Sequence, residues 1–208
     1  MELRLDQAVP LIRRAGLLVR YGLAGVRRKE LFEAQLQQLD APAPAVPATY
    51  RFGDSHDLRE RLTAERHDYD RCAKQLMQRR LQSGDRLVLG ELHGEVIFSG
   101  WLMVGAIECG TRRVVRISPQ RAYAYKLHTV AAYRGLRMAS GFYQFLQPIL
   151  IGLGCRSVAC WIAESNVASI AAHRRVGFAP VGQAYELRVG CRSWSWMNRA
   201  VSRRLAAP

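Results

Sequence analysis

A regular alternation of strand-like and helix-like segments after residue 48 constrains the fold of this chain most strongly. Short apolar runs are bounded by turn residues, and His93-Gly94 between two of them is typical of a hairpin. Later segments with apolar residues spaced three and four apart predict helices. This mixture predicts an α/β or α+β fold with a mixed sheet. The expected strands are 49–52, 86–92, 95–104, 114–117, 122–130, 157–162, 181–189 and 192–198, and the expected helices begin near 54, 68, 140 and 165.

The beginning of the chain has a different pattern. Within residues 10–29, apolar side chains such as Leu11, Leu18 and Val26 share one face of a helical wheel, arginines lie opposite, and no acidic residue occurs. This spacing predicts a basic amphipathic helix. Two interpretations remain open, because the apolar face can pack on the rest of the protein or lie on an anionic membrane surface.

A proline-rich stretch at residues 40–48 follows this segment. Three prolines within nine residues favour an extended, semi-rigid linker. We therefore expect an N-terminal helical segment at 1–39, a linker at 40–48 and one folded domain, large enough to hold an active site, at 49–208.

The net charge indicates the kind of partner. The chain has 31 basic and 17 acidic residues, which gives a formal charge of +14 and a pI near 10.3. No acidic residue occurs between Glu108 and Glu164. Such a surface attracts anions, so nucleic acid, an anionic membrane, a phosphorylated cofactor and an acidic carrier protein are all candidate partners.

Composition and cysteine content narrow the compartment. With 49% hydrophobic and 23% charged residues, the chain has the composition of a folded globular protein. Five cysteines without CxxC spacing argue against a disulfide framework and against a zinc site. No uncharged apolar run reaches the length of a membrane span, and the N-terminal segment has no clear cleavage site. We expect a cytoplasmic protein without a metal, with peripheral contact to the inner face of the membrane as an option through residues 10–29.

The stretch 127–140 carries the first chemical signal. An expected strand runs into a short turn with Gly135, and the small residues Ala139 and Ser140 open an apolar-faced helix. Backbone N–H groups at a helix N-terminus have no intrahelical partner and carry partial positive charge, so they can bind a phosphate or pyrophosphate. Strand–turn–helix units with one glycine are common, and this signal alone is weak.

A second motif lies one helix and one strand later, at residues 166–178. Together with the first, it resembles the GNAT superfamily of acyl-CoA-dependent N-acyltransferases over residues 49–198. The first motif resembles the pyrophosphate loop of that family, and the second resembles its Asn-x-x-Ala/Ser-Ile helix that ends in Gly-Phe. The matching residues are Arg134, Gly135, Leu136, Arg137, Met138 and Ala139, then Asn166, Ser169, Ile170, Arg175, Gly177 and Phe178.

This resemblance implies a fold and a cofactor. The family fold is a mixed, mostly antiparallel twisted sheet in which two central parallel strands splay apart, flanked by helices. Acetyl-CoA or another acyl-CoA is the expected co-substrate, and the backbone of the first splayed strand would hold its pantetheine arm. The implied cofactor-binding residues are Leu127, Thr129, Arg134, Gly135, Leu136, Arg137, Met138, Ala139, Ser140, Asn166 and Ser169.

Two departures from the family pattern concern residues 137 and 173. Arg137 stands where the loop usually has glycine, which is tolerable if its φ stays negative, and its guanidinium could bond to phosphate. His173 stands where the family commonly has a tyrosine that is often proposed to reprotonate the leaving thiolate. We expect His173 to be that proton donor, or else a residue on an arginine-rich helix surface. Tyr125 is the candidate base, with His128 and Glu95 as alternatives.

The expected function is transfer of an acetyl group from acetyl-CoA to a primary amine by direct attack. The acceptor is not identified by the sequence: an amino sugar, a small metabolite and a protein terminus stay open, and a small-molecule amine is the expected partner. One alternative is transfer of a longer acyl chain from acyl-CoA or from acyl carrier protein, which the basic surface would suit. A nucleic-acid-binding module is the alternative from another class. No recognised nucleic-acid motif supports that alternative, and we expect no nucleic-acid partner.

Overall fold

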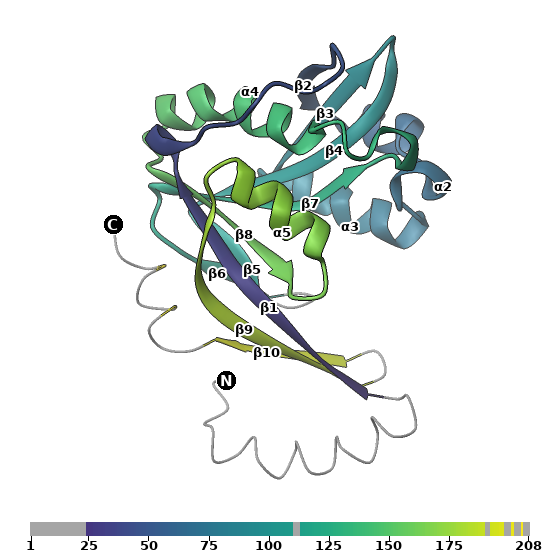
Figure 1. The fold of residues 1–208 in the computed structure, drawn as a ribbon. Helices are drawn as coiled ribbons and strands as arrows, with labels where there is room; N and C mark the ends of the chain where they lie inside the picture. Colours follow the sequence, from purple (N-terminus) through teal and green to yellow (C-terminus); the bar gives the residue numbers. More distant parts are fainter. Residues whose placement is uncertain (1–23, 110–112, 190–191, 198–200, 202–204, 206–208) are drawn as a thin grey trace, which may run out of the picture.

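The computed structural model describes residues 24–109, 113–189 and 192–197, together with Val201 and Leu205 (Figure 1). Most of the strands in these segments form a single large sheet, and all neighbours in it are antiparallel except β7 and β8. In spatial order the sheet comprises β10 (Arg192–Met197), β9 (Ala179–Val189), β1 (Ala24–Gln35), β8 (Ser157–Ala163), β7 (Arg121–Thr129), β4 (Glu95–Val104), β3 (Arg86–Leu92) and β2 (Thr49–Gly53). A separate hairpin is formed by β5 (Ala106–Cys109) and β6 (Arg113–Arg116).

Helices cover both faces of the sheet (Figure 1). One face packs on α4 (Met138–Gly152) and α5 (Val167–Arg175), with Phe142 and Leu146 of α4 fully buried. The other packs on α3 (Arg71–Gln82) and the short α2 (Ala64–His67), with Met77 of α3 fully buried. Three short helical turns complete these segments: η1 (Leu36–Gln38), η2 (Asp57–Arg61) and η3 (Ala131–Tyr133).

Strand β1 corrects the expectation for the beginning of the chain. Residues 24–29, expected in a helix, are extended, and β1 lies between β8 and β9 in the middle of the sheet. Two consecutive residues of β1, Leu31 and Phe32, are both fully buried. Each belongs to the hydrophobic cluster on a different face of the sheet. Successive side chains that point to opposite faces are typical of a strand. This alternation was not evident in the sequence, because the segment is short and rich in arginine. The predicted helix is therefore wrong for 24–29, and its part at 10–23 lies outside the described residues.

The proline-rich stretch is packed against α4. The Ala45 N–H donates to the Leu136 carbonyl (3.0 Å), and Gln144 Nε2 donates to the Ala41 carbonyl (2.6 Å). A Cβ on Gly141 would lie 2.6 Å from the Pro44 side chain, so the absence of a side chain at 141 permits this approach. Because β1 precedes this stretch and belongs to the main sheet, residues 40–48 do not separate an N-terminal unit from a domain at 49–208.

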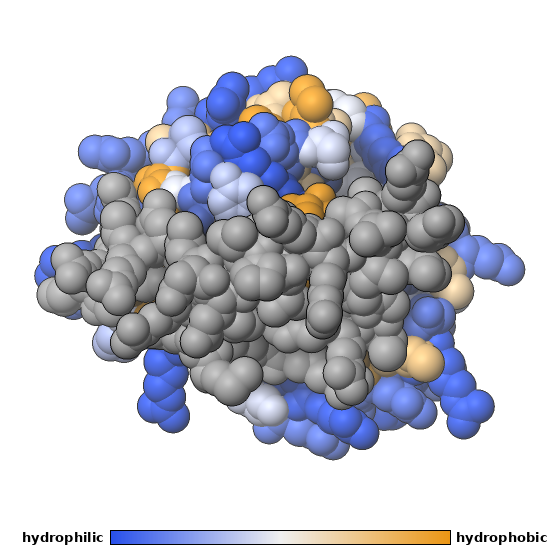
Figure 2. All heavy atoms as spheres, turned by 90° about the horizontal axis from the view of Figure 1, so that it is seen from below, coloured by the Kyte–Doolittle hydropathy of each residue, from blue (hydrophilic) through white to orange (hydrophobic). Residues whose placement is uncertain are grey.

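In the part of the chain described here, no helix combines the length and apolar character that crossing a membrane requires. Figure 2 shows one side of the molecule, on which the described surface is mostly hydrophilic with small, separate hydrophobic areas.

Candidate functional site

The parallel strands β7 and β8 separate after a short paired region. Their pairing runs from Arg121 opposite Ser157 to Tyr123 opposite Ala159, whereas the strands themselves continue to Thr129 and Ala163. In β7, Lys126 has φ +49°, and the pairing with β4 shifts register at this level. An extra residue of this kind bends a strand, so the bulge turns the end of β7 away from β8. The result is a gap between two central strands.

The edge of β7 that faces this gap presents backbone donors. The Val130 N–H donates to the Ile97 carbonyl on the β4 side (3.0 Å). Successive backbone N–H groups along a strand point to opposite edges. The N–H groups of Thr129 and Leu127 are therefore directed to the gap beside β8.

The N-terminus of α4 lies just beyond the end of β7 and lacks a side-chain cap. Gly135 (φ +82°) and Arg137 (φ +60°) form the turn before it, and no acidic residue stands in its first turn. The condition of a negative φ at Arg137 is not met, because this residue adopts the left-handed conformation that glycine normally provides. Met138 and Ala139 are the first two residues of the helix, so their N–H groups have no intrahelical acceptor.

The side chains around this helix start add positive charge. Arg134 and Arg137 are exposed, and Arg134 Nε donates to the Thr129 carbonyl (3.3 Å), which ties the loop to the end of β7. Leu136 is half-buried, and Met138 and Ser140 are buried beneath the loop. Oriented N–H groups with two nearby guanidinium groups suit a pyrophosphate.

The N-terminus of α5 is built differently. The Asn166 side chain accepts the Ser169 N–H (3.1 Å), so it caps its own helix. The Ser169 carbonyl in turn accepts a hydrogen bond from His173. The structure thus uses the polar groups of Asn166 and Ser169 within α5 and does not bring them to the anion-binding turn before α4.

His173 is buried, with only 4% of its surface exposed, so the expectation of a surface residue is wrong. Its Nδ1–H donates to the Ser169 carbonyl (2.7 Å), and its Nε2 accepts the Tyr143 hydroxyl (2.9 Å). Burial lowers the pKa of His173, which keeps the ring neutral. Both ring nitrogens are engaged inside the protein, so this geometry does not favour proton donation to a ligand.

The candidate bases are also engaged elsewhere. The Tyr125 hydroxyl donates to Asp85 Oδ2 (2.6 Å), and Asp85 immediately precedes β3, on the side of β7 away from β8. Burial, then Asp85, raises the pKa of Tyr125. His128 Nε2 donates to the Arg66 carbonyl (2.9 Å), while Glu95 pairs with the Arg66 side chain (3.1 Å). None of these three side chains is therefore directed to the gap by its hydrogen bonds.

Sequence reasoning missed Tyr143 and Asp85, the partners that determine how His173 and Tyr125 lie. Tyr143 is fully buried on the face of α4 that packs against α5, and helical spacing from Phe142 and Leu146 could have indicated a buried position. Asp85 had no comparable signal, because its contact with Tyr125 depends on strand order. Among the described residues, no group of three or more histidine, cysteine, aspartate or glutamate side chains could hold a metal ion.

Comparison with known proteins gives the family. The model of the acetyltransferase (GNAT) family matches residues 54–178, more than half of the chain. A comparison with curated protein sequences gives no match.

Solved structures share the fold at low sequence identity. A conserved protein of unknown function from Staphylococcus epidermidis ATCC 12228 has a TM-score of 0.61 at 9% identity, over 91% of this chain and 69% of that one. A GNAT-family acetyltransferase from Colwellia psychrerythraea has a TM-score of 0.57 at 14% identity, over 84% of this chain and 57% of that one. AAC(6')-Iy, in complex with the bisubstrate analogue CoA-S-monomethyl-acetylneamine, has a TM-score of 0.51 at 14% identity, over 64% and 92%.

The family model spans both separating strands, the uncapped helix α4, and α5 together with Gly177 and Phe178, which follow it. The family model and the fold agree, and this chain belongs to the GNAT acetyltransferase family.

Proposed function

We propose that this protein transfers an acetyl group from acetyl-CoA to the primary amine of a small molecule. The observation that carries this proposal is the gap between β7 and β8, which leads directly to the uncapped N-terminus of α4. One solved structure with this fold contains a bisubstrate analogue that joins CoA to an acetylated amine. This supports the same class of donor and acceptor here.

The described residues fit a CoA ligand in two places. The backbone N–H groups of Leu127 and Thr129 would pair with the pantetheine arm along the open edge of β7. The turn from Arg134 to Ser140 would bind the pyrophosphate through backbone N–H groups at the start of α4, with Arg134 and Arg137 adding charge-assisted hydrogen bonds. Asn166 and Ser169 support this site by fixing the start of α5.

The chemistry requires little more than positioning and a backbone donor. Acetyl-CoA supplies a thioester: a C–N bond forms to its carbonyl carbon, the C–S bond breaks, the amine loses a proton and the thiolate gains one. A β7 N–H in the gap is directed to donate to the carbonyl oxygen as negative charge develops there. The side chains of Tyr125 and His173 have hydrogen-bond partners inside the protein, so we propose that they act by positioning.

A longer acyl chain is a second candidate for the donor. The observation that favours it is the absence of acidic residues between Glu108 and Glu164, a stretch that includes the exposed Arg134 and Arg137. An acidic carrier protein would be attracted to this surface.

We place the protein in the cytoplasm. The proposed contact with an anionic membrane is kept for residues 10–23, and binding to anionic vesicles tests it directly.

The deciding experiment measures binding and turnover separately. Thermal unfolding with CoA, acetyl-CoA and a twelve-carbon acyl-CoA tests the donor, because a ligand at a hundred times its Kd adds about 2.7 kcal/mol of stability. Thiol release with a panel of amines then tests the acceptor. We expect stabilisation by acetyl-CoA and thiol release with at least one small amine. If none of the three ligands (CoA, acetyl-CoA and the twelve-carbon acyl-CoA) stabilises the protein, the proposal is contradicted.

A further inference from the structure

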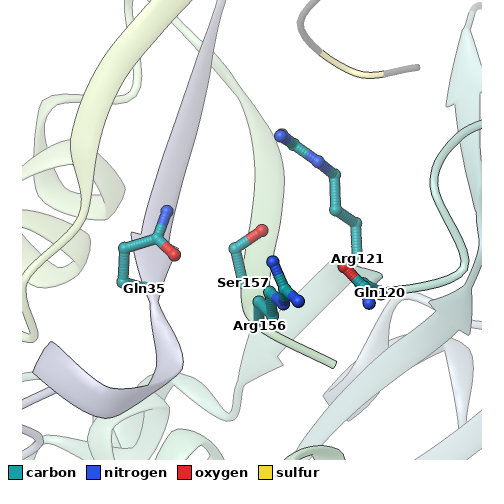
Figure 3. A pocket seen from close by; sticks show the side chains of 5 residues that line it. All are labelled: Gln35, Gln120, Arg121, Arg156 and Ser157. Carbon is teal, nitrogen blue, oxygen red and sulfur yellow. The ribbon is translucent and has the colours of Figure 1, made fainter. Parts of the chain in front are cut away.

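A small polar pocket lies at the opposite end of the β7–β8 pair from the gap. Figure 3 shows its lining, which comes from the end of β1, from the turn before β7, and from the starts of β7 and β8. Its volume is about 180 Å³, which is roughly the share of six waters in the liquid. All of its lining side chains are polar: Gln35, Gln120, Arg121, Arg156 and Ser157.

A buried carboxylate holds one of the two arginines. Arg121 Nη1 donates to Glu33 Oε1 (2.6 Å), and the Ser157 hydroxyl donates to the same oxygen (2.7 Å). Glu33 is only 5% exposed, so this ion pair is shielded from water. Because Arg121 and Ser157 are the first register partners of β7 and β8, the cluster fixes the closed end of these strands.

Among the described residues, the second arginine has no counterion. The Arg156 side chain is exposed, and among the described residues it makes no ion pair or side-chain hydrogen bond. Its backbone N–H donates to the Gln120 carbonyl (2.7 Å), and its carbonyl accepts the Leu36 N–H (2.8 Å). These two bonds hold the backbone that carries the guanidinium beside the pocket. With two arginines and one carboxylate, the pocket has an excess positive charge.

Gln120 contributes an unpaired acceptor. Its Oε1 atom is buried and lacks a hydrogen-bond partner in the described structure. A buried acceptor without a partner is unfavourable, so a ligand that donates to it would gain stability. The pocket therefore combines positive charge with one acceptor.

We propose that this pocket binds a small oxyanion that carries a hydroxyl group, with inorganic phosphate as its simplest form. The oxyanion oxygens accept charge-assisted hydrogen bonds from Arg156 and face the positive side of the Arg121–Glu33 pair. The hydroxyl donates to Gln120 Oε1. Bound there, the anion links the turn before β8 to the start of β7 and stabilises the paired end of the two strands. This site is separate from the turn at α4 and does not depend on acyl transfer.

Thermal unfolding of the full chain tests this site. Phosphate at ten times its Kd should raise the Tm by about 4 °C relative to chloride at equal ionic strength. In Arg156→Gln most of this rise should disappear, while Arg71→Gln, a matched change of an exposed arginine on α3, should retain it. Phosphate bound at α4 contributes equally to all three proteins, so their difference isolates the pocket. An equal rise in Arg156→Gln and wild type would overturn the proposal.

Sulfate tests the hydroxyl. It has the shape and charge of phosphate but no proton to donate at neutral pH, so the part of its stabilisation that depends on Arg156 should be clearly smaller. Replacement of Gln120 by leucine should remove this difference between the two anions. An Arg156-dependent effect of sulfate as large as that of phosphate would overturn the assignment of Gln120 as the partner of a hydroxyl.

Discussion

The N-termini of α4 and α5 present the two motifs of the family in opposite ways. At α4 no side chain caps the helix, and the preceding residue, Arg137, holds the left-handed conformation at φ +60°. At α5 the side chain of the preceding residue, Asn166, accepts a hydrogen bond from the Ser169 N–H and so caps the helix. One helix start keeps its backbone donors available to a ligand, whereas the other satisfies its own.

This difference shows that the two motifs of one family can have different physical tasks. The turn before α4 carries the anion-binding groups. The residues of α5 hold that helix together and hold it against α4: Asn166 caps it, and His173 joins the Ser169 carbonyl to the Tyr143 hydroxyl. Changes at α4 should therefore affect ligand affinity, and changes at α5 should affect stability.

The largest expected effect is on CoA affinity when an acidic residue is placed at the start of α4. Ala139→Asp adds a carboxylate at the second position of the helix, where a pyrophosphate would bind. Two like charges about 5 Å apart at an effective dielectric constant of 20 repel by about 3 kcal/mol, which corresponds to more than 100-fold in Kd. Calorimetric titration with CoA measures the change.

The matched control makes the same change at the same position of α5. Ala168 is exposed and is the second residue of that helix. An aspartate near either helix start is favourable for the helix dipole, by about 0.3–1 kcal/mol, so both variants should fold. Ala168→Asp should leave CoA affinity within about twofold. Equal losses of affinity in the two variants would remove the distinction between the two helix starts.

The sequence predicted only those parts of the fold that local patterns determine. Most strands after residue 48 were predicted because apolar alternation and turn residues such as Gly94 are local signals. Strand β1 was missed because its place between β8 and β9 is set by pairing across more than 120 residues, as between Leu31 and Trp161. For the same reason the sequence indicated the anion-binding turn before α4 but not the direction of the Tyr125 hydroxyl.

The next effect in size concerns stability and involves His173. Removing its imidazole in His173→Ala leaves the fully buried Tyr143 hydroxyl without its partner and opens a cavity. An unsatisfied buried hydroxyl destabilises by about 1–3 kcal/mol, so we expect a loss of about 2 kcal/mol in urea unfolding. Turnover of the folded fraction should stay within about threefold. A fall of about 100-fold or more in kcat, with stability unchanged, would instead identify His173 as a proton donor.

Stability should depend on pH through the same residue and through His67. Burial lowers the pKa of both, and His67 is held by the Thr63 N–H at Nδ1 and by the Val96 carbonyl at Nε2. The unfolded chain therefore binds more protons, and stability falls as the pH drops below about 6.5 and is constant just above it. Each histidine contributes at most about 1.4 kcal/mol per pH unit. The free energy of unfolding measured from pH 5 to 7.5 checks the slope.

A matched pair of variants assigns this slope. His173→Gln should reduce it, while replacement of the exposed His56 by glutamine should leave it unchanged. A slope of the same size in His173→Gln would mean that other groups cause the loss of stability in acid.

The smallest expected effect tests the cap of α5. Asn166→Ala removes the side-chain acceptor of the Ser169 N–H and should lower the free energy of unfolding by about 1 kcal/mol. Asn166→Asp keeps an acceptor at the cap and should restore most of this stability. CoA affinity should change by less than about twofold in both, because the Asn166 side chain bonds within its own helix rather than to the turn at α4. A loss of CoA affinity in Asn166→Ala that exceeds its loss of stability would mean that Asn166 also contacts the ligand, and the two helix starts would then share one task.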